Sequence, residues 1–196
     1  FTNLSFDQTQ NKIVSNRVDN TIGTGRTTSY LNTNGFYGIN GNISYSKPFA
    51  ERKYTVTLSA NGNYDNNISF IDNQKYQGQN WIVRPAARFR LDLKEIIDID
   101  LNASYAINKT ITYSRTDLAK SLTLGINGKN FFFKDYTLGY DFSKIINSGY
   151  IGTVNSNPVL LNVYFEHRFL KNNMGTLRLQ GFDLFNQNTG ISREVN

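Results

Sequence analysis

The sequence predicts a transmembrane antiparallel up-and-down β-barrel, with about 8–10 strands visible in the chain and a larger barrel as the expected whole. Three observations predict this fold class. Apolar and polar residues alternate with a period of two along most of the 196 residues, aromatic residues reach 14% although hydrophobic residues reach only 39%, and the connections alternate in length. A barrel wall combines these properties because only every second residue of each strand meets the apolar phase.

The alternation is clearest in Tyr54–Asp65. One face carries Tyr54, Val56, Leu58, Ala60, Gly62 and Tyr64, whereas threonine, serine, asparagine and aspartate occupy the positions between them. Helical spacing would mix these two sets, and a strand separates them. The segment that begins at Ile99 repeats the pattern. We expect about nine strands, the first within Leu4–Val14 and the last clear one opening at Leu177.

The predicted connections fall into two classes of length. Short ones are expected near Pro48–Arg52, Lys94–Asp98, Phe133–Asp135 and Lys171–Gly175, and longer polar ones near Asn16–Thr28, Asn66–Asn80 and Asn147–Asn157. The link near Ser114–Asp117 is short where a long one is due. Short turns on one rim and long loops on the other are typical of outer-membrane barrels.

Aromatic residues stand at the ends of several apolar faces. Tyr54 and Tyr64 bracket one face, Tyr37 and Tyr45 bracket another, and Trp81 begins a third. Tyrosine and tryptophan prefer the membrane–water interface, where one end of the ring stays wet. Strands are also rich in aromatic residues for intrinsic reasons. Their position at both ends favours an interfacial girdle.

Charged residues concentrate on the faces opposite the apolar ones. Because arginine or lysine on the lipid face costs about 2–4 kcal/mol at the midplane, we expect these charges to line the lumen or lie near the rims. The candidates are Arg84, Arg88, Arg90 and Asp92 on one strand and Asp100, Asp141, Glu166, Arg168 and Arg178 on others. They form either a structural network of arginine–carboxylate pairs or a basic strip that contacts an anionic solute or a plug.

Several function classes are disfavoured by what the sequence lacks. No apolar run is long enough for a transmembrane helix, and cysteine is absent. The net charge of +6 is scattered without a run of three basic residues, which argues against a nucleic-acid partner. His167 is the single histidine, and no neighbouring motif supplies it with a catalytic partner. We therefore expect no enzyme activity, no metal site and no cofactor.

The segment Val159–Arg193 carries the most specific pattern. A strand ending in Phe165-Glu166-His167-Arg168-Phe169 leads into a short turn, and Asp183-Leu184-Phe185-Asn186-Gln187-Asn188 follows one strand later, with Ser192-Arg193 just after. This run resembles the C-terminal barrel region of the outer-membrane β-barrel family related to TonB-dependent receptors. In that family a similar run lies on the penultimate strand.

The resemblance implies a location in the outer membrane of a Gram-negative bacterium and TonB-linked uptake or binding of a solute. It also implies outer-membrane lipid, TonB-type energy-coupling machinery or a surface lipoprotein as partners. We expect residues 1–196 to be a single barrel domain, a fragment that lacks its last strand and any N-terminal plug. Two alternatives stay open: a small closed barrel with a structural, adhesive or anchoring role, and a soluble lipocalin-like barrel with an apolar interior.

Overall fold

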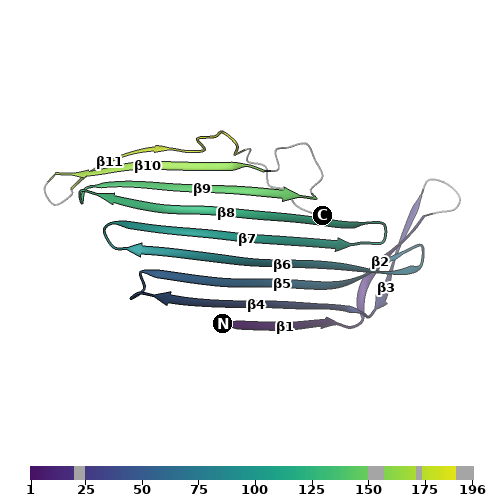
Figure 1. The fold of residues 1–196 in the computed structure, drawn as a ribbon. Coiled ribbons are helices and arrows are strands. Elements are labelled where there is room, and N and C mark those ends of the chain that lie inside the picture. The colour runs from purple at the N-terminus through teal and green to yellow at the C-terminus, as the bar shows by residue number, and fades with distance from the viewer. Residues whose placement is uncertain (20–24, 150–156, 171–173, 189–196) are drawn as a thin grey trace. The chain divides into compact units, whose positions relative to one another are not determined.

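The computed structural model describes residues 1–19, 25–149, 157–170 and 174–188, and within them the chain is all-β (Figure 1). The strands are β1 (Thr2–Thr9), β2 (Lys12–Asp19), β3 (Arg26–Thr33), β4 (Phe36–Phe49), β5 (Tyr54–Ile71), β6 (Gln74–Leu93), β7 (Ile97–Ile111), β8 (Thr116–Phe132), β9 (Tyr136–Ser148), β10 (Val159–Phe169) and β11 (Gly175–Gly181). In these described ranges, no helix has the length and apolar character needed to cross a membrane.

The eleven strands belong to one sheet, and nine of them follow the order β1-β4-β5-β6-β7-β8-β9-β10-β11. Neighbours from β4 onward are joined up and down, as predicted. The hairpin of β2 and β3 lies off this path, and β2 meets β5 through a short parallel bridge. Within the part of the chain that the structure describes, β1 and β11 are the two ends of this order, so the sheet is not closed.

The chain separates into two compact units, and strands β4 to β8 each contribute residues to both. The first unit comprises Phe1–Ile43, Ala60–Arg84 and Ala106–Ala119. The second comprises Ser44–Ser59, Pro85–Tyr105 and Lys120–Asn196.

The predicted count of about nine strands is wrong, because the N-terminal segment holds more strands than its pattern indicated. A turn at Gln10 and Asn11 divides Leu4–Val14 between β1 and β2. Asn11 adopts a positive φ of 52°, a conformation that asparagine tolerates better than most residues. Strand β3 then occupies part of the segment predicted as a long loop near Asn16–Thr28, of which residues 20–24 lie outside the described residues.

The long loop predicted at Asn66–Asn80 is also wrong. Strands β5 and β6 continue through this polar segment and meet at the two-residue turn Asp72–Asn73. Both turn residues have positive φ, 50° and 63°, which matches the twist that a tight hairpin requires. The segment is polar because the β5–β6 hairpin extends beyond the apolar part of its strands. In such a segment both faces are polar, so alternation cannot distinguish a strand from a loop.

The short connections are confirmed near Pro48–Arg52, Lys94–Asp98 and Phe133–Asp135, and so is the short link near Ser114–Asp117. Positive φ angles at Glu51, Glu95 and Lys134 provide the tight reversals. The remaining predicted connections, Lys171–Gly175 and Asn147–Asn157, contain residues 171–173 and 150–156, which lie outside the described residues.

Asn16 anchors the β2–β3 hairpin on the turn between β5 and β6. Its side chain is 1% exposed, its Nδ2 donates to Asn73 Oδ1 at 2.7 Å, and its Oδ1 accepts from the Asn73 backbone N–H at 3.3 Å. The backbone N–H of Asp72 donates to the Arg17 carbonyl at 2.9 Å. At the far end of this hairpin Arg26 donates to Asp19 at 2.7 Å, and this hydrogen bond, with the charge of Asp19, raises the pKa of Arg26.

Candidate functional site

The registers of the second unit sort its strands into an apolar and a polar face, because directly opposed residues of antiparallel strands share a face. On the apolar face Ile126 opposes Phe142, and Phe142 opposes Leu161. Phe165 opposes Leu138 on one side and Leu179 on the other. The alternation read along each strand is therefore maintained from strand to strand across β8, β9, β10 and β11.

The apolar face of the second unit is open rather than covered. Leu124 is 40% exposed, Phe165 is 43% exposed and Leu179 is 66% exposed. Two lysines, Lys120 on β8 and Lys144 on β9, share this face, and Nζ of Lys144 donates to the Asn157 carbonyl at 2.8 Å. Lys144 thus directs its charge along the strand end, as long basic side chains do at the edge of an apolar region.

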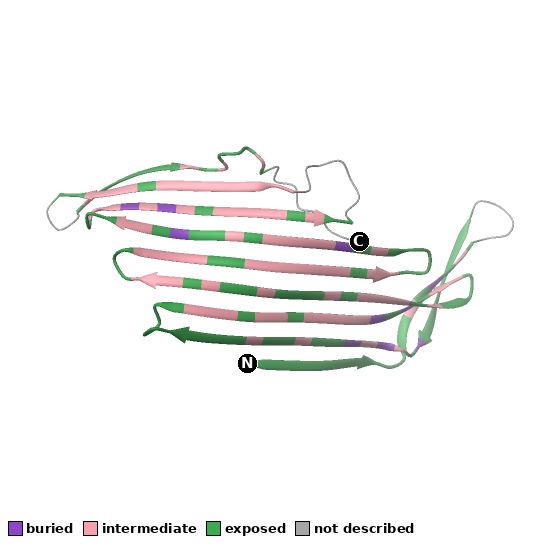
Figure 2. Cartoon of the chain, viewed as in Figure 1, coloured by how far each residue is buried: buried purple, intermediate pink, exposed green. Residues whose placement is uncertain are grey.

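The first unit shows the same division. Leu4 opposes Gly41 and Phe6 opposes Ile39 on its apolar face, whereas Asn3 opposes Asn42 on its polar face. Leu4 and Phe6 are 74% and 61% exposed. The whole of β1 is exposed, as expected for a strand at the end of the sheet order (Figure 2).

Aromatic rings contact one another on both apolar faces. In the first unit Tyr37 lies 5.6 Å from Tyr64 between ring centroids, and Tyr64 lies 4.2 Å from Trp81. In the second unit the ring of His167 stacks on Tyr136 at 4.2 Å, and its Nδ1 is buried without a hydrogen-bond partner among the described residues. His167 therefore packs as an aromatic residue, and no described residue forms a hydrogen bond with its side chain that would orient it as a base.

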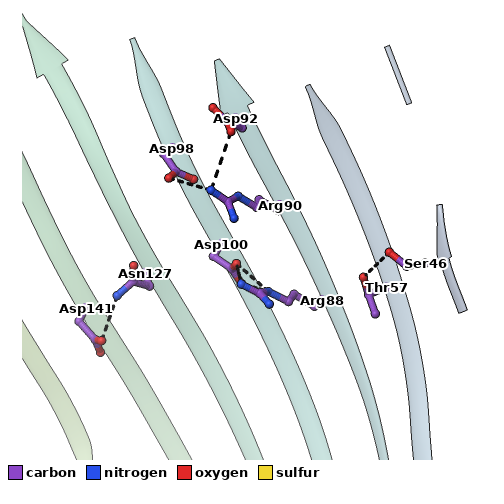
Figure 3. Close-up of polar contacts among 9 residues, drawn as sticks. All are labelled: Ser46, Thr57, Arg88, Arg90, Asp92, Asp98, Asp100, Asn127 and Asp141. Atoms are coloured by element: carbon purple, nitrogen blue, oxygen red, sulfur yellow. Dashed lines mark hydrogen bonds and ion pairs between the residues drawn. The ribbon is translucent and has the colours of Figure 1, made fainter. Parts of the chain in front are cut away.

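A cluster of charged side chains joins β6 and β7 within the second unit (Figure 3). Arg88 engages both carboxylate oxygens of Asp100, with Nε at 2.8 Å from Oδ1 and at 2.6 Å from Oδ2, and its NH2 group also contacts Asp100. Arg90 lies 3.1 Å from Asp98 and 3.8 Å from Asp92. We call these five residues the arginine–aspartate cluster.

Further polar pairs continue across β8 to β11. Asn127 donates to Asp141 at 3.1 Å, as Figure 3 shows. Arg178 lies 4.0 Å from Glu166, and its guanidinium group sits 3.8 Å from the centre of the Tyr164 ring. Tyr164 in turn lies over Gly139, where any side chain would collide with the ring.

These contacts show which predicted residues come together. Arg88, Arg90, Asp92 and Asp100 form one cluster, Glu166 pairs with Arg178, and Asp141 pairs with the uncharged Asn127. Because each arginine in these contacts meets at least one carboxylate, the geometry is that of a structural network rather than an unbalanced basic strip. That these residues line a lumen stays a prediction.

Two predicted residues stand apart from these pairs. Arg168 on β10 has its Nε buried without a hydrogen-bond partner among the described residues, although its backbone N–H donates to the Asp135 carbonyl at 2.8 Å. Arg84 belongs to the first unit and lines a polar hollow there together with asparagines from β1, β4 and β5. Neither arginine forms an ion pair in the part of the chain that the structure describes.

Sequence reasoning missed Asp98, which completes the arginine–aspartate cluster. The signal was present, since Asp98 and Asp100 are two residues apart and so share a face of one strand. It also missed the asparagines around Arg84, because a single asparagine on a strand resembles any other exposed polar residue. Only the lateral alignment of three strands turns them into a group.

The Asp183–Asn188 run forms a turn beyond the end of β11, so the place on a strand that the resemblance implied for it is wrong. Asp183 accepts hydrogen bonds from the backbone N–H groups of Gln187 at 3.0 Å and Asn188 at 2.9 Å. The Gln187 side chain accepts from the Val159 N–H at 2.8 Å, and Leu184 N–H donates to the Leu161 carbonyl at 2.9 Å. The turn thus satisfies the edge of β10 where β11 no longer pairs with it.

Within the described ranges, no group of three or more histidine and acidic side chains could hold a metal ion. Comparison of the chain with protein-family models, with curated proteins and with solved structures gives no match.

Proposed function

We propose that this chain forms part of the wall of a β-barrel in the outer membrane of a Gram-negative bacterium. Its apolar faces meet lipid and its polar faces meet a water-filled lumen. The protein is a solute uptake or binding protein similar to TonB-dependent receptors. The exposed apolar face, maintained in register from strand to strand, is the observation that carries this proposal.

Exposure of this kind is unusual outside a membrane. A soluble monomer rarely leaves a contiguous apolar patch larger than a few hundred Å² open to water. Here residues as large as Phe6, Leu58 and Leu179 are each more than half exposed. A membrane supplies an apolar phase for such a face without further protein, while the opposite face keeps its charges in water.

The strand count bears on the soluble alternative. Lipocalin-like barrels close with eight strands around one small ligand. Nine strands in one antiparallel order, with no ladder between the first and the last in the described residues, fit a wider wall better. In lipid, every strand edge must be paired, since each unsatisfied backbone group costs several kcal/mol. The proposal therefore requires β1 and β11 to be paired in the membrane.

The uptake part of the proposal rests on the resemblance carried by Asp183–Asn188 and the strand before it. The turn hydrogen-bonds to backbone groups of β10, and such groups must be satisfied in a membrane. Asp183 organises the turn, and Gln187 and Leu184 satisfy backbone groups of β10 that would otherwise lie unpaired.

Trp81 offers a direct test, since it is the only tryptophan and lies on the apolar side of β6. We expect lipids brominated on their acyl chains to quench its fluorescence when the protein is reconstituted in vesicles. The matched control is the double variant Trp81→Phe, Ile82→Trp, which moves the indole to the polar side of the same strand. Quenching of Trp81 with little quenching of the control supports the proposal. Equal quenching at both positions, or a chain that stays dispersed in water without detergent, would refute it.

A further inference from the structure

The polar hollow around Arg84 differs from the rest of the polar face in having many amides and no carboxylate. It is about 380 Å³ in volume and lies entirely in the first unit. Its polar side chains come from β1, β4, β5 and β6. We call the group Asn3, Asn40, Asn42, Asn61, Asn63 and Arg84 the asparagine patch.

Register pairs the patch residues of β1 with those of β4. Asn3 opposes Asn42, and Ser5, which also lines the hollow, opposes Asn40. Five of the six patch residues are exposed, and Asn63 is half-buried. The alternation along β5 puts Asn61 and Asn63 on one face, with Gly62 between them on the other.

The hydrogen-bonding capacity of the patch is largely unused. Asn63 donates from Nδ2 to Asp65 at 2.7 Å, but its Oδ1 is buried with no hydrogen-bond partner among the described residues. Asn3, Asn42 and Asn61 make no side-chain hydrogen bond with a described residue. A cross-strand ladder that served only to hold the sheet together would pair these amides with one another.

The charge of the patch is equally unbalanced. The guanidinium of Arg84 forms no ion pair with a described residue, in contrast to Arg88 and Arg90 on the same strand. Two aspartates lie beside the patch without lining the hollow: Asp65, which accepts from Asn63, and Asp7, two positions beyond Ser5 on β1. An exposed arginine among neutral amides attracts an anion and can bind a carboxylate with two parallel hydrogen bonds.

We propose that the asparagine patch binds an acidic oligosaccharide, with Arg84 on a sugar carboxylate and the asparagine amides on the neighbouring hydroxyls. Amides suit hydroxyl groups because each amide both donates and accepts, as each hydroxyl does. Several amides spaced along neighbouring strands match an extended ligand with many hydroxyls better than they match a compact anion. This inference deepens the proposed function, on which it rests, by naming the class of solute.

Isothermal titration calorimetry on the full chain in detergent tests the inference, with trigalacturonate as the acidic sugar and maltotriose as the neutral one. We expect saturable binding of trigalacturonate and at least tenfold weaker binding of maltotriose. Arg84→Gln should weaken trigalacturonate binding by about tenfold or more, since a hydrogen-bonded charge pair is lost. Arg52→Gln is the matched control, because Arg52 is an exposed arginine at a turn outside the patch, and it should bind as the unmodified protein does.

The double variant Asn42→Ala, Asn61→Ala should weaken the binding of both sugars. This result would separate the contribution of the amides from that of the Arg84 charge. The folded state of the double variant is checked by circular dichroism, and Arg84→Gln remains the test if this variant does not fold. The inference would be overturned if the protein showed no saturable binding of trigalacturonate, or if Arg84→Gln bound trigalacturonate as tightly as the unmodified protein. Competition by inorganic phosphate as strong as that by trigalacturonate would overturn the sugar assignment. The quenching of Trp81 is independent of all these results, so the sugar inference can fail while the membrane proposal stands.

Discussion

Arg88 on β6 and Asp100 on β7 face each other across the polar side of the sheet, and the guanidinium group engages both carboxylate oxygens. The two side chains differ in exposure, at 57% for Arg88 and 18% for Asp100. The carboxylate is thus the more sheltered partner, and the arginine covers it from the open side. This pair joins two long strands at a polar position of the sheet.

Removing one partner of this pair should destabilise the sheet modestly. We expect Arg88→Ala to lower the free energy of unfolding by about 1 kcal/mol, because pairs this exposed contribute little. Urea-induced unfolding in lipid vesicles measures the change. The charge-swapped double variant Arg88→Asp, Asp100→Arg should recover part of the loss, and a double variant less stable than either single one would contradict a pairwise interaction.

Substitutions on the apolar face should have larger effects on stability. Leu58 is 52% exposed on the apolar side of β5, and Leu58→Arg should destabilise the chain in a bilayer by about 2–4 kcal/mol. Asn61→Arg, on the opposite side of the same strand, is the control and should cost much less. Comparable folding of the two variants in vesicles would reverse the assignment of the faces. Ala103, Leu124 and Val163 carry the same expectation, since each lies on the apolar side of its strand.

Asn16 should be the residue on which the β2–β3 hairpin depends. Asn16→Ala leaves polar groups of Asn73 without their buried partner, which costs about 1–3 kcal/mol. Proteolysis between β2 and β3 should then become faster. Asn32→Ala, an exposed asparagine on β3, provides the comparison and should leave the cleavage rate unchanged. Equal cleavage of both variants would show that the docking seen here does not protect the hairpin.

Gln187 should protect one backbone group of β10. In Gln187→Leu the Val159 N–H loses its acceptor, so we expect its amide hydrogen to exchange faster by tenfold or more, for a loss of about 1.4 kcal/mol in local protection. Hydrogen exchange followed by NMR in detergent gives the rate. The Phe165 amide, in the middle of the ladder to β11, should be unaffected. An unchanged Val159 rate would mean that another group satisfies this N–H.

Topology can be tested by labelling, since the chain has no cysteine of its own. Short turns lie on the periplasmic side of outer-membrane barrels. A membrane-impermeant thiol reagent on intact cells should therefore spare Glu51→Cys, at the short turn between β4 and β5. It should modify Ser114→Cys, because the link between β7 and β8 joins the opposite ends of the strands. The opposite pattern would invert the proposed orientation, and labelling of neither position in permeabilised cells would show that the sites are inaccessible.

The sequence alone established the all-β class, the assignment of faces along the strands and most short turns. These features are local: alternation depends on successive side chains of one strand pointing to opposite sides, and Tyr54–Asp65 displays that without any partner. The same reasoning failed at Asn66–Asn80 and within Leu4–Val14. There both faces are polar or the turn is short, and no difference between faces marks the strand.

The tertiary structure decided which residues on different strands meet. Asp98 joins Arg90, Asp183 caps a turn instead of continuing a strand, and the patch around Arg84 is assembled from four strands. Each depends on register, which is set by turn geometry and by the burial of neighbouring faces across the sheet. The sequence of a single strand shows its own alternation, but it does not determine the register in which the neighbouring strand pairs with it. For that physical reason the sequence determined the two faces of this protein, and only the fold determined the sites on them.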